Sequence, residues 1–356
     1  MSRPLHIAIT ADPYLPVPPR FYGGIERVLD FLVRGLAARG HQVTLFAHPE
    51  SDVPATLVPY GAPPHFTRGA RGRELWQVGS QLWSRRHEFD LIHSFGRLAA
   101  LAPVLALRSL PKIQSYQRGG LPWRSICTAR RLGRTSMQFT ACSSNVYRDA
   151  PANDGPWHTI FNGVDLAKYT FRPDVGEDAP LAFLGRIEPI KGAHNAIAIA
   201  KAAGRRLTIA GNRVPQYRDY FASQIAPHVD GDRVQYIGPV DDAAKNALLS
   251  SSAALLMPIE WEEPFGIVMA EAMACGTPVI GFARGSVGEV VRNGVNGYAC
   301  RGKADAVWAV ARIATIDRQT VRRDCERRFS STVIVGQYEK LDVGHASACP
   351  RPEGAN

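Results

Sequence analysis

The feature that most constrains the fold of this chain is an alternation of strand-like and helix-like segments that occurs twice. LHIAIT (residues 5–10) is a short apolar run with β-branched residues, which is typical of a buried parallel strand. A helix-periodic stretch follows and ends at Gly40, and HQVTLFA then supplies a second strand. Its apolar positions are Val28, Leu29, Leu32, Val33 and Leu36. Strand, helix and strand at this spacing predict a βαβ unit.

The same pattern continues along the chain. In the first half, strands are expected at residues 90–93, followed by an apolar helical stretch at 98–107, and at 112–116. In the second half they are expected at residues 181–185, 207–211, 234–238, 254–259 and 278–282. We therefore expect two Rossmann-like, doubly wound α/β domains.

The domain boundaries follow from composition. A stretch rich in Pro, Asp and Gly at residues 171–180 is the expected linker. We expect an N-terminal domain at 1–172 and a C-terminal domain at 173–325. A helix at 326–342 is expected to cross back to the N-terminal domain, and 343–356 to form a frayed tail.

The charge balance favours anionic ligands. The chain has 42 Lys+Arg against 32 Asp+Glu, a formal net charge of +10. Such an excess suits phosphates, nucleic acid or an acidic membrane surface, although basic runs are commonly solvated helix faces. The densest groups are Arg68, Arg71, Arg73, Arg85 and Arg86, and then Arg118, Arg124, Arg130, Arg131 and Arg134.

Other features indicate a cytoplasmic protein. No apolar run reaches the roughly 18 residues of a spanning helix, and MSRPL runs directly into a strand-like stretch, so we expect no secretion signal. The six cysteines lie far apart with no C-x-x-C, so we expect reduced thiols and no structural zinc.

In open α/β sheets, ligands bind beyond the carboxyl ends of the strands, so the strand-to-helix turns are the candidate sites. The first such turn holds Gly23 and Gly24 at a helix start, after a long loop. Glycines there let a phosphate approach backbone N–H groups, although a GG before a helix is also a common turn. The motif is not G-x-G-x-x-G, which argues against a nicotinamide-dependent oxidoreductase.

Two further turns carry charged side chains. GRIEPIKG places Arg186 and Lys191 five residues apart after a strand, which suits a diphosphate whose charge grows as it leaves. The alternative is an exposed surface pair. EEPFGIVMAEAMACGTPVIGF places Glu263 and Glu271 eight residues apart, with Glu263 expected in a loop and Glu271 one or two turns into a helix. A carboxylate there can accept hydrogen bonds from two hydroxyls of a ribose or sugar ring.

Taken together, these motifs resemble those of the retaining glycosyltransferases of family 4, which have the GT-B fold of two domains facing each other across a cleft. The matching blocks are GGIER, SSNVYRDA, TIFNGVD, FLGRIEPIKG, EEPFGIVMAEAMACGTPVIGF and GSVGEVVRNGVNGY. The resemblance spans about residues 5–342, with the E-x(7)-E block its most specific part.

The resemblance implies roles for the turn residues. A nucleotide-diphospho-sugar donor would bind mainly to the C-terminal domain, with Arg186 and Lys191 holding its diphosphate and stabilising the departing phosphate. Glu271 would bind the ribose hydroxyls. Gly23 and Gly24 would let the N-terminal loop close over the phosphates.

The donor sugar would lie at the start of the E-x(7)-E helix. Glu263 would face the sugar, and backbone amides around Phe265, Gly266 and Ile267 would contact its hydroxyls. The family's chemistry is transfer with retention, in which the leaving phosphate itself takes the acceptor's proton. It usually needs no metal, and we expect neither a metal nor a cofactor besides the donor.

One position departs from the family pattern. Members often carry a His after the fourth strand, near the reacting sugar, where this chain has Gln117, which cannot titrate. His93 matches a strand-end His of many relatives, although such a His is as often structural. His93, Gln117 and Arg118 are the candidate residues on the acceptor or sugar side.

The acceptor would bind the N-terminal domain. Basic and aromatic residues interleave there (Tyr116, Arg118, Trp123, Arg124), which fits an anionic acceptor such as a lipid diphosphate at the cytoplasmic membrane face. We expect a role in bacterial surface glycan, exopolysaccharide or glycolipid synthesis. The same charge is compatible with peripheral membrane association and equally with a solvated surface.

Two alternatives stay open. A GT-B nucleotide-sugar epimerase or hydrolase would share the donor crevice but needs positioned acid and base groups. A non-catalytic nucleotide-sugar-binding partner subunit would bind donor without turnover, with Gln117 marking the loss of activity. Nucleic-acid binding is favoured only by charge, because no matching module is present.

Overall fold

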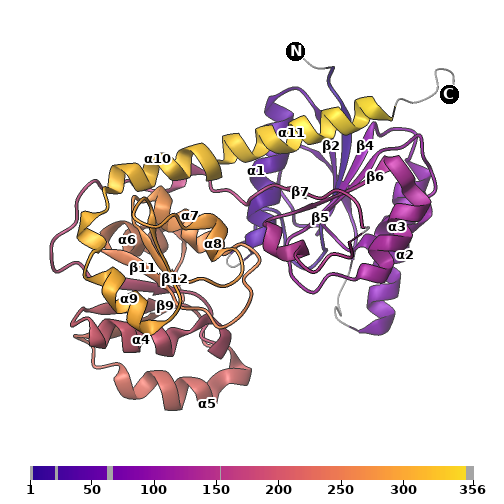
Figure 1. Ribbon diagram of the computed structural model, residues 1–356. Coiled ribbons are helices and arrows are strands. Elements are labelled where there is room, and N and C mark those ends of the chain that lie inside the picture. The colour runs from indigo at the N-terminus through magenta and orange to yellow at the C-terminus, as the bar shows by residue number, and fades with distance from the viewer. Residues whose placement is uncertain (1–2, 21–22, 62–66, 153, 350–356) are drawn as a thin grey trace. The chain divides into compact units, whose positions relative to one another are not determined.

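The computed structural model describes residues 3–20, 23–61, 67–152 and 154–349, which form two compact α/β units (Figure 1). Unit 1 comprises the chain up to Asn162 and again from Ser331. Unit 2 comprises Gly163–Ser330. The fold class expected from the alternating pattern is confirmed.

The division after Asn162 lies ten residues before the expected boundary at 172. The reason is that residues 163–172 hydrogen-bond to the body of unit 2. Val164 N donates to Phe329 O at 2.8 Å, and Arg172 N donates to Cys275 O at 3.2 Å. The expected linker at 171–180 is therefore attached to unit 2.

Unit 1 is a parallel seven-stranded sheet with helices on both faces. Its strand order is β3-β2-β1-β4-β5-β6-β7. The strands are β1 (His6–Thr10), β2 (Gln42–Ala47), β3 (Thr56–Pro59), β4 (Leu91–Ser94), β5 (Lys112–Tyr116), β6 (Met137–Ala141) and β7 (His158–Thr159). The helices are α1 (Gly24–Ala38), α2 (Arg68–Ser84), α3 (Trp123–Gly133) and α11 (Ser331–Ala348), with a 3₁₀ helix η1 (Leu98–Val104).

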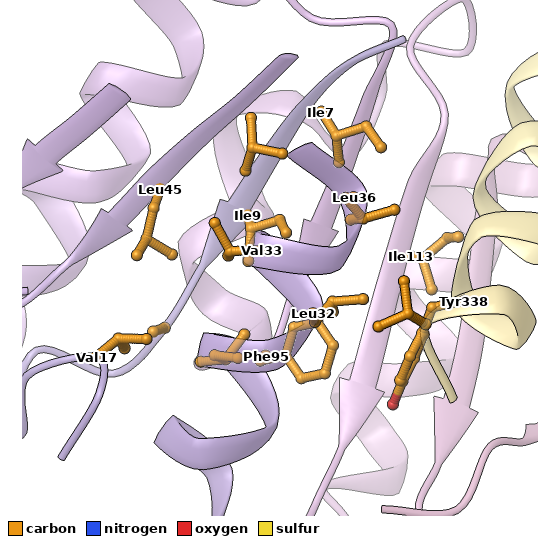
Figure 2. Close-up of a cluster of buried hydrophobic side chains, with 14 of the residues drawn as sticks. Ile7, Ile9, Val17, Leu32, Val33, Leu36, Leu45, Phe95, Ile113 and Tyr338 are labelled. Atoms are coloured by element: carbon orange, nitrogen blue, oxygen red, sulfur yellow. The ribbon is translucent and has the colours of Figure 1, made fainter. Parts of the chain in front are cut away.

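Alternation along the strands divides the core of unit 1 into two layers. Ile7 and Ile9 of β1 pack with α1 and α11, as Figure 2 shows, whereas Ala8 between them packs in the layer of α2, η1 and α3. A period of two is what a strand buried on both faces requires.

The last helix completes this core. A helix was expected at 326–342 with a tail from 343, but the chain breaks at Ser330 and α11 continues to Ala348. Tyr338 of α11 is fully buried, beside Ile113 and Leu32 in Figure 2, and α11 packs on α1. Residues 343–348 stay helical because Val343 and Ala346 pack against the same core and buried His345 lies with Nε2 3.1 Å from Ser136 O, which the expectation of a frayed tail missed.

Unit 2 is a parallel six-stranded sheet in the order β10-β9-β8-β11-β12-β13. Helices α4 and α9 pack on each other, while α7 packs on α6 and α10 (Figure 1). The strands are β8 (Leu181–Leu184), β9 (Leu207–Ala210), β10 (Val234–Gly238), β11 (Ala254–Met257), β12 (Val279–Phe282) and β13 (Gly297–Cys300). The helices are α4 (Ala193–Ala202), α5 (Arg218–Tyr220), α6 (Asp242–Ser251), α7 (Ile267–Ala274), α8 (Val287–Val290), α9 (Lys303–Val310) and α10 (Arg318–Phe329).

Each strand order reverses direction at one point, between β1 and β4 in unit 1 and between β8 and β11 in unit 2. In open α/β sheets the loops leaving the carboxyl ends of such strands form the ligand crevice. The GG turn follows β1, GRIEPIKG follows β8, and the E-x(7)-E block follows β11. All three motifs therefore lie at a topological switch point of their own unit. Within the described residues, no helix is long and apolar enough to cross a membrane.

Candidate active site

Two loops of unit 2 meet at its switch point because β8 and β11 are neighbours. The loop at 185–192 and the loop at 258–266 are joined by a hydrogen bond from Glu260 N to Ile190 O at 2.8 Å. Gly192 has φ +77°, and a Cβ there would lie 2.0 Å from Pro258 O. Only glycine fits this position, since a side chain would push the two loops apart.

Lys191 and Glu263 form an ion pair between the two loops. Lys191 Nζ lies 2.6 Å from Glu263 Oε2, and these side chains are 16% and 10% exposed. Trp261 Nε1 donates to the same oxygen at 2.9 Å, and Lys191 Nζ lies 4.6 Å from the centre of the Trp261 ring. Glu263 is thus fixed between Lys191 and Trp261, at the loop that follows β11.

The backbone of Glu263 is fixed by the GSVGE block. Ser286 N donates to Glu263 O at 2.9 Å. Gly285 has φ +58°, and a Cβ there would lie 2.3 Å from both the nitrogen and the oxygen of Glu263. The GSVGE block therefore supports the site, because its glycine lets the backbone of the block approach the backbone of Glu263.

Arg186 lies in the first loop and has its own carboxylate partner. Its Nη2 is 2.8 Å from Glu188 Oε1; the Arg186 side chain is 38% exposed and the Glu188 side chain is buried. Arg186 and Lys191 each carry a carboxylate neighbour here. A bound diphosphate would add acceptors to these cations rather than meet bare charges.

Glu271 lies in the second turn of α7, while Glu263 lies in the preceding loop, as their spacing predicts. Glu271 Oε1 accepts from Tyr169 Oη at 2.7 Å and from Lys245 Nζ at 2.6 Å. Glu271 and Lys245 are both buried. The carboxylate is therefore held by a cation on α6 and a phenol on the segment that enters unit 2.

The start of α7 presents backbone donors. Gly266, with φ +70°, is its N-cap residue, Ile267 is its first residue, and Phe265 is buried before it. The first backbone N–H groups of a helix have no partner within the helix and favour electron-rich ligands. These are the amides expected to contact the donor sugar.

In unit 1, the GG turn opens α1. Gly24 is the first helical residue and Gly23 its N-cap. A Cβ on Gly23 would lie 2.7 Å from Pro19 Cβ and 2.8 Å from Glu26 Oε2, whereas one on Gly24 would meet nothing within 4 Å, so the turn is tightly packed at Gly23 alone. This close packing is compatible with either a phosphate-binding turn or a purely structural one.

The candidate residues on the acceptor side are differently placed. His93 is fully buried, with Nδ1 2.8 Å from Asp342 Oδ1 and Nε2 2.7 Å from Ser115 Oγ. Such a ring has no surface for a sugar, so the structural role replaces the one expected for His93. Gln117 is largely buried with Nε2 3.4 Å from Tyr338 Oη, whereas the Arg118 side chain is 69% exposed, 3.9 Å from Asp12.

Three residues of the unit 2 site were not predicted: Trp261, Lys245 and Tyr169. Trp261 stands two residues before Glu263, but no motif in the sequence analysis assigned it a role. Lys245 could have been predicted from the sequence to lie on the buried side of α6, because it stands three and four residues before Leu248 and Leu249. A lysine on an apolar helix face needs a partner for its charge.

Two parallel-sheet α/β units, each with motif-bearing loops at its switch point, are the architecture of GT-B glycosyltransferases. Residues 171–328 match the family model "Glycosyl transferases group 1", and residues 22–168 match "Glycosyltransferase Family 4". The two matches together span most of the chain. This protein belongs to the family 4 glycosyltransferases, as its motifs predicted.

Individual relatives cover nearly the whole chain. A glycogen synthase of Mycobacterium tuberculosis is 29% identical over 94% of this chain and 95% of its own. The crystal structure of AviGT4, a glycosyltransferase of avilamycin A biosynthesis, matches with a TM-score of 0.70 and 26% identity over 97% of this chain and 98% of its own. Anabaena HepE in complex with UDP and glucose matches in fold with a TM-score of 0.70 and 20% identity, over 95% and 99%.

Proposed function

We propose that the protein transfers a sugar from a nucleotide-diphospho-sugar to a hydroxyl acceptor with retention and without a metal or other cofactor. The observation that carries this is the Lys191–Glu263 pair, with Arg186 in the same loop, at the switch point of unit 2. Two cations and a neighbouring carboxylate at the ligand-binding edge of the sheet support binding of a diphosphate there. A structural neighbour bound to UDP and glucose supports the donor class.

The proposed chemistry assigns one task to each group. Arg186 and Lys191 bind the diphosphate and stabilise the negative charge that grows on it as the bond to the anomeric carbon breaks. The phosphate oxygen that leaves takes the proton of the acceptor hydroxyl, so no separate base is required. Glu263 faces the sugar, on which positive charge develops, and the first amides of α7 contact the sugar hydroxyls.

The nucleoside end is assigned to Glu271, whose carboxylate accepts hydrogen bonds from the ribose hydroxyls. In unit 1, the GG turn closes over the phosphates, and Gln117 and exposed Arg118 serve the acceptor or sugar side. The proposed acceptor is a glycan or lipid-linked hydroxyl of a bacterial surface polymer.

Turnover of defined donors tests this proposal. UDP-glucose, UDP-N-acetylglucosamine, GDP-mannose and ADP-glucose are each incubated with simple glycoside acceptors, with and without EDTA, and nucleoside diphosphate release is followed. We expect acceptor-dependent release that EDTA does not change, and NMR of the product shows the donor's anomeric configuration. An isomerised sugar without acceptor supports an epimerase, and donor binding with no turnover supports the partner subunit.

Peripheral contact with an anionic membrane is proposed on the surface of α2. Trp76 and Trp83 are 73% and 43% exposed and line a shallow hollow of about 420 Å³ with Leu75, Gly79, Ser80 and Pro103. Arg71 and Arg73 are exposed on the same helix, and the Arg86 guanidinium stacks 4.3 Å from the Trp83 ring centre. The single acidic residue of α2, Glu74, is buried beside Arg97. Tryptophan and arginine together favour an interface of anionic headgroups.

Vesicle sedimentation checks this surface. We expect binding to phosphatidylglycerol-containing vesicles, none to pure phosphatidylcholine, and a several-fold loss in a Trp76→Ala, Trp83→Ala double variant. Trp308→Ala is the matched control, because Trp308 is 50% exposed and is also stacked by an arginine, Arg312, at 4.0 Å. Equal losses in the double variant and the control would contradict a specific role for α2.

A further inference from the structure

The buried cluster around Glu271 joins three segments that are far apart in the sequence. Glu271 lies on α7, Lys245 on α6, and Tyr169 on the segment through which the chain enters unit 2. Their contacts are short: 2.6 Å from Lys245 Nζ and 2.7 Å from Tyr169 Oη to Glu271 Oε1. Lys245 Nζ also lies 5.6 Å from the centre of the Tyr169 ring and 3.2 Å from Asp242 Oδ1.

We infer that Lys245 and Tyr169 are positioning residues for nucleotide binding, which hold Glu271 so that its second carboxylate oxygen receives the ribose hydroxyls. The inference rests on the ribose role given to Glu271 in the proposed function. Neither Lys245 nor Tyr169 belongs to the six sequence blocks that carry the resemblance to the family.

The geometry of the hydrogen bonds carries the argument. Among the described residues, both hydrogen bonds to the Glu271 carboxylate end on Oε1. A carboxylate has about four acceptor positions, two on each oxygen. Two donors on Oε1 therefore leave the acceptor positions of Oε2 for the two neighbouring hydroxyls of a ribose.

The charge balance points the same way. A buried carboxylate without a cation is costly, and Lys245 supplies that cation from inside the unit. Arg186 and Lys191 are therefore not needed to neutralise Glu271, and both can bind the diphosphate.

The position of Tyr169 is fixed by the next residue, Thr170. Thr170 N donates to Asn246 Oδ1 at 2.8 Å, and Asn246 Nδ2 donates to Thr170 Oγ1 at 2.9 Å. This pair docks the entering segment on α6 next to Lys245, so the phenol of Tyr169 reaches Glu271 in one defined orientation. The cluster thus orients the carboxylate by two independent attachments.

The test measures the ratio of the affinities for a ribonucleotide and for its 2′-deoxy counterpart. Loss of a merely structural residue would weaken the binding of both equally and leave this ratio unchanged. Binding of UDP, GDP and ADP and of dUDP, dGDP and dADP is measured by calorimetry. For the preferred base, we expect the wild type to bind the ribonucleotide about tenfold or more tightly than the deoxy form, the strength of a hydrogen bond to a charged group. Lys245→Met should reduce that ratio to about threefold or less, and Lys245→Arg should restore part of it.

Further variants complete the test. Tyr169→Phe keeps the ring and removes the hydroxyl, so it tests the inference even where Lys245→Met does not fold, and we expect a partial loss of discrimination. With donor sugar, both variants should raise KM while leaving kcat within about twofold. Lys201→Met, on the exposed side of α4, is the matched lysine control and should match the wild type.

The outcomes separate the inference from the proposed function. A wild-type ratio near one, unchanged in Glu271→Gln, overturns the ribose role and this inference with it. A clear wild-type ratio that Glu271→Gln abolishes but that survives in Lys245→Met and Tyr169→Phe overturns the inference alone.

Discussion

The two glutamates of the E-x(7)-E block are held in the same way. On each, one oxygen accepts from a lysine ammonium and from an aromatic donor: Lys191 and Trp261 for Glu263, and Lys245 with a phenol for Glu271. The motif spacing predicted where the glutamates lie, because a loop followed by a helix start fixes their separation. It could not predict their partners, since these come from other loops and helices that only the sheet order brings close.

At the residue scale, the first test is of the negative charge of Glu263. Glu263→Gln keeps the shape but loses the negative charge beside the reacting sugar, so we expect kcat to fall by about a hundredfold, the scale of one lost electrostatic contact in a transition state. UDP, GDP and ADP lack the donor sugar that Glu263 faces, so their binding should change less than about threefold. The measurement compares turnover with calorimetry of the same variant.

Glu177→Gln, in the exposed loop before β8, controls for the loss of one negative charge from unit 2. A Glu263→Gln enzyme that turns over like the wild type would remove Glu263 from the reacting centre.

At the scale of elements, the close approach of the loops at 185–192 and 258–266 makes the site. The strands before these loops were predicted from apolar runs, as were seven others. Four strands were not predicted: β3, β6, β7 and β13. β7 has two residues and β13 reads GYAC, so pairing with a neighbour in the sheet, rather than their own sequence, makes these two segments strands. β6 reads MQFTA, whose alternation of apolar and polar residues is a strand signal that was not used. The stretch after β4 formed a 3₁₀ helix, since Pro103 lies within it.

Two glycines allow the loop contact to be measured. Gly192 and Gly204 both have a left-handed φ, +77° and +64°, but a Cβ on Gly192 would lie 2.0 Å from Pro258 O while one on Gly204 would meet nothing within 4 Å. Gly204→Ala should cost about 1 kcal/mol of unfolding free energy from backbone strain alone. Gly192→Ala should cost about 3 kcal/mol or more, since its clash is with backbone, and should also weaken nucleotide binding. Denaturant unfolding and calorimetry check this; equal costs would contradict the tight loop contact.

At the scale of the whole chain, unit 2 is an insertion between the body of unit 1 and its last helix. Two α/β units could be predicted from the repeated alternation. The length of α11 could not, because residues 343–348 have no strong helical signal and are held by packing. Buried Tyr338 and His345 attach α11 to unit 1, the latter with Nε2 3.1 Å from Ser136 O.

The attachment of α11 should weaken in mild acid. Burial lowers the pKa of His345 below its ordinary value of 6.5, so the folded chain keeps the ring neutral where the unfolded chain takes up a proton. Because the unfolded state binds more protons below pH 6.5, stability falls as pH falls through that range. We expect the melting temperature to drop between pH 7 and pH 5, and to drop less in His345→Gln.

Burial also lowers the pKa of His6 and His158, so some acid sensitivity should persist in that variant. Exposed His87→Gln serves as the control and should keep the wild-type slope. An unchanged slope in His345→Gln would show that this ring is not what acid destabilises.

The central claim is that the loops after β8 and β11 bind the diphosphate of a nucleotide sugar. Calorimetric titration with UDP, GDP and ADP, repeated in Arg186→Ala and Lys191→Ala, tests it most directly. We predict a clear preference for one base and a loss of at least about tenfold in affinity in each variant, because each removes a charge-assisted hydrogen bond to phosphate. Binding of none of the three by the folded wild type, or equal binding by both variants, would contradict the claim.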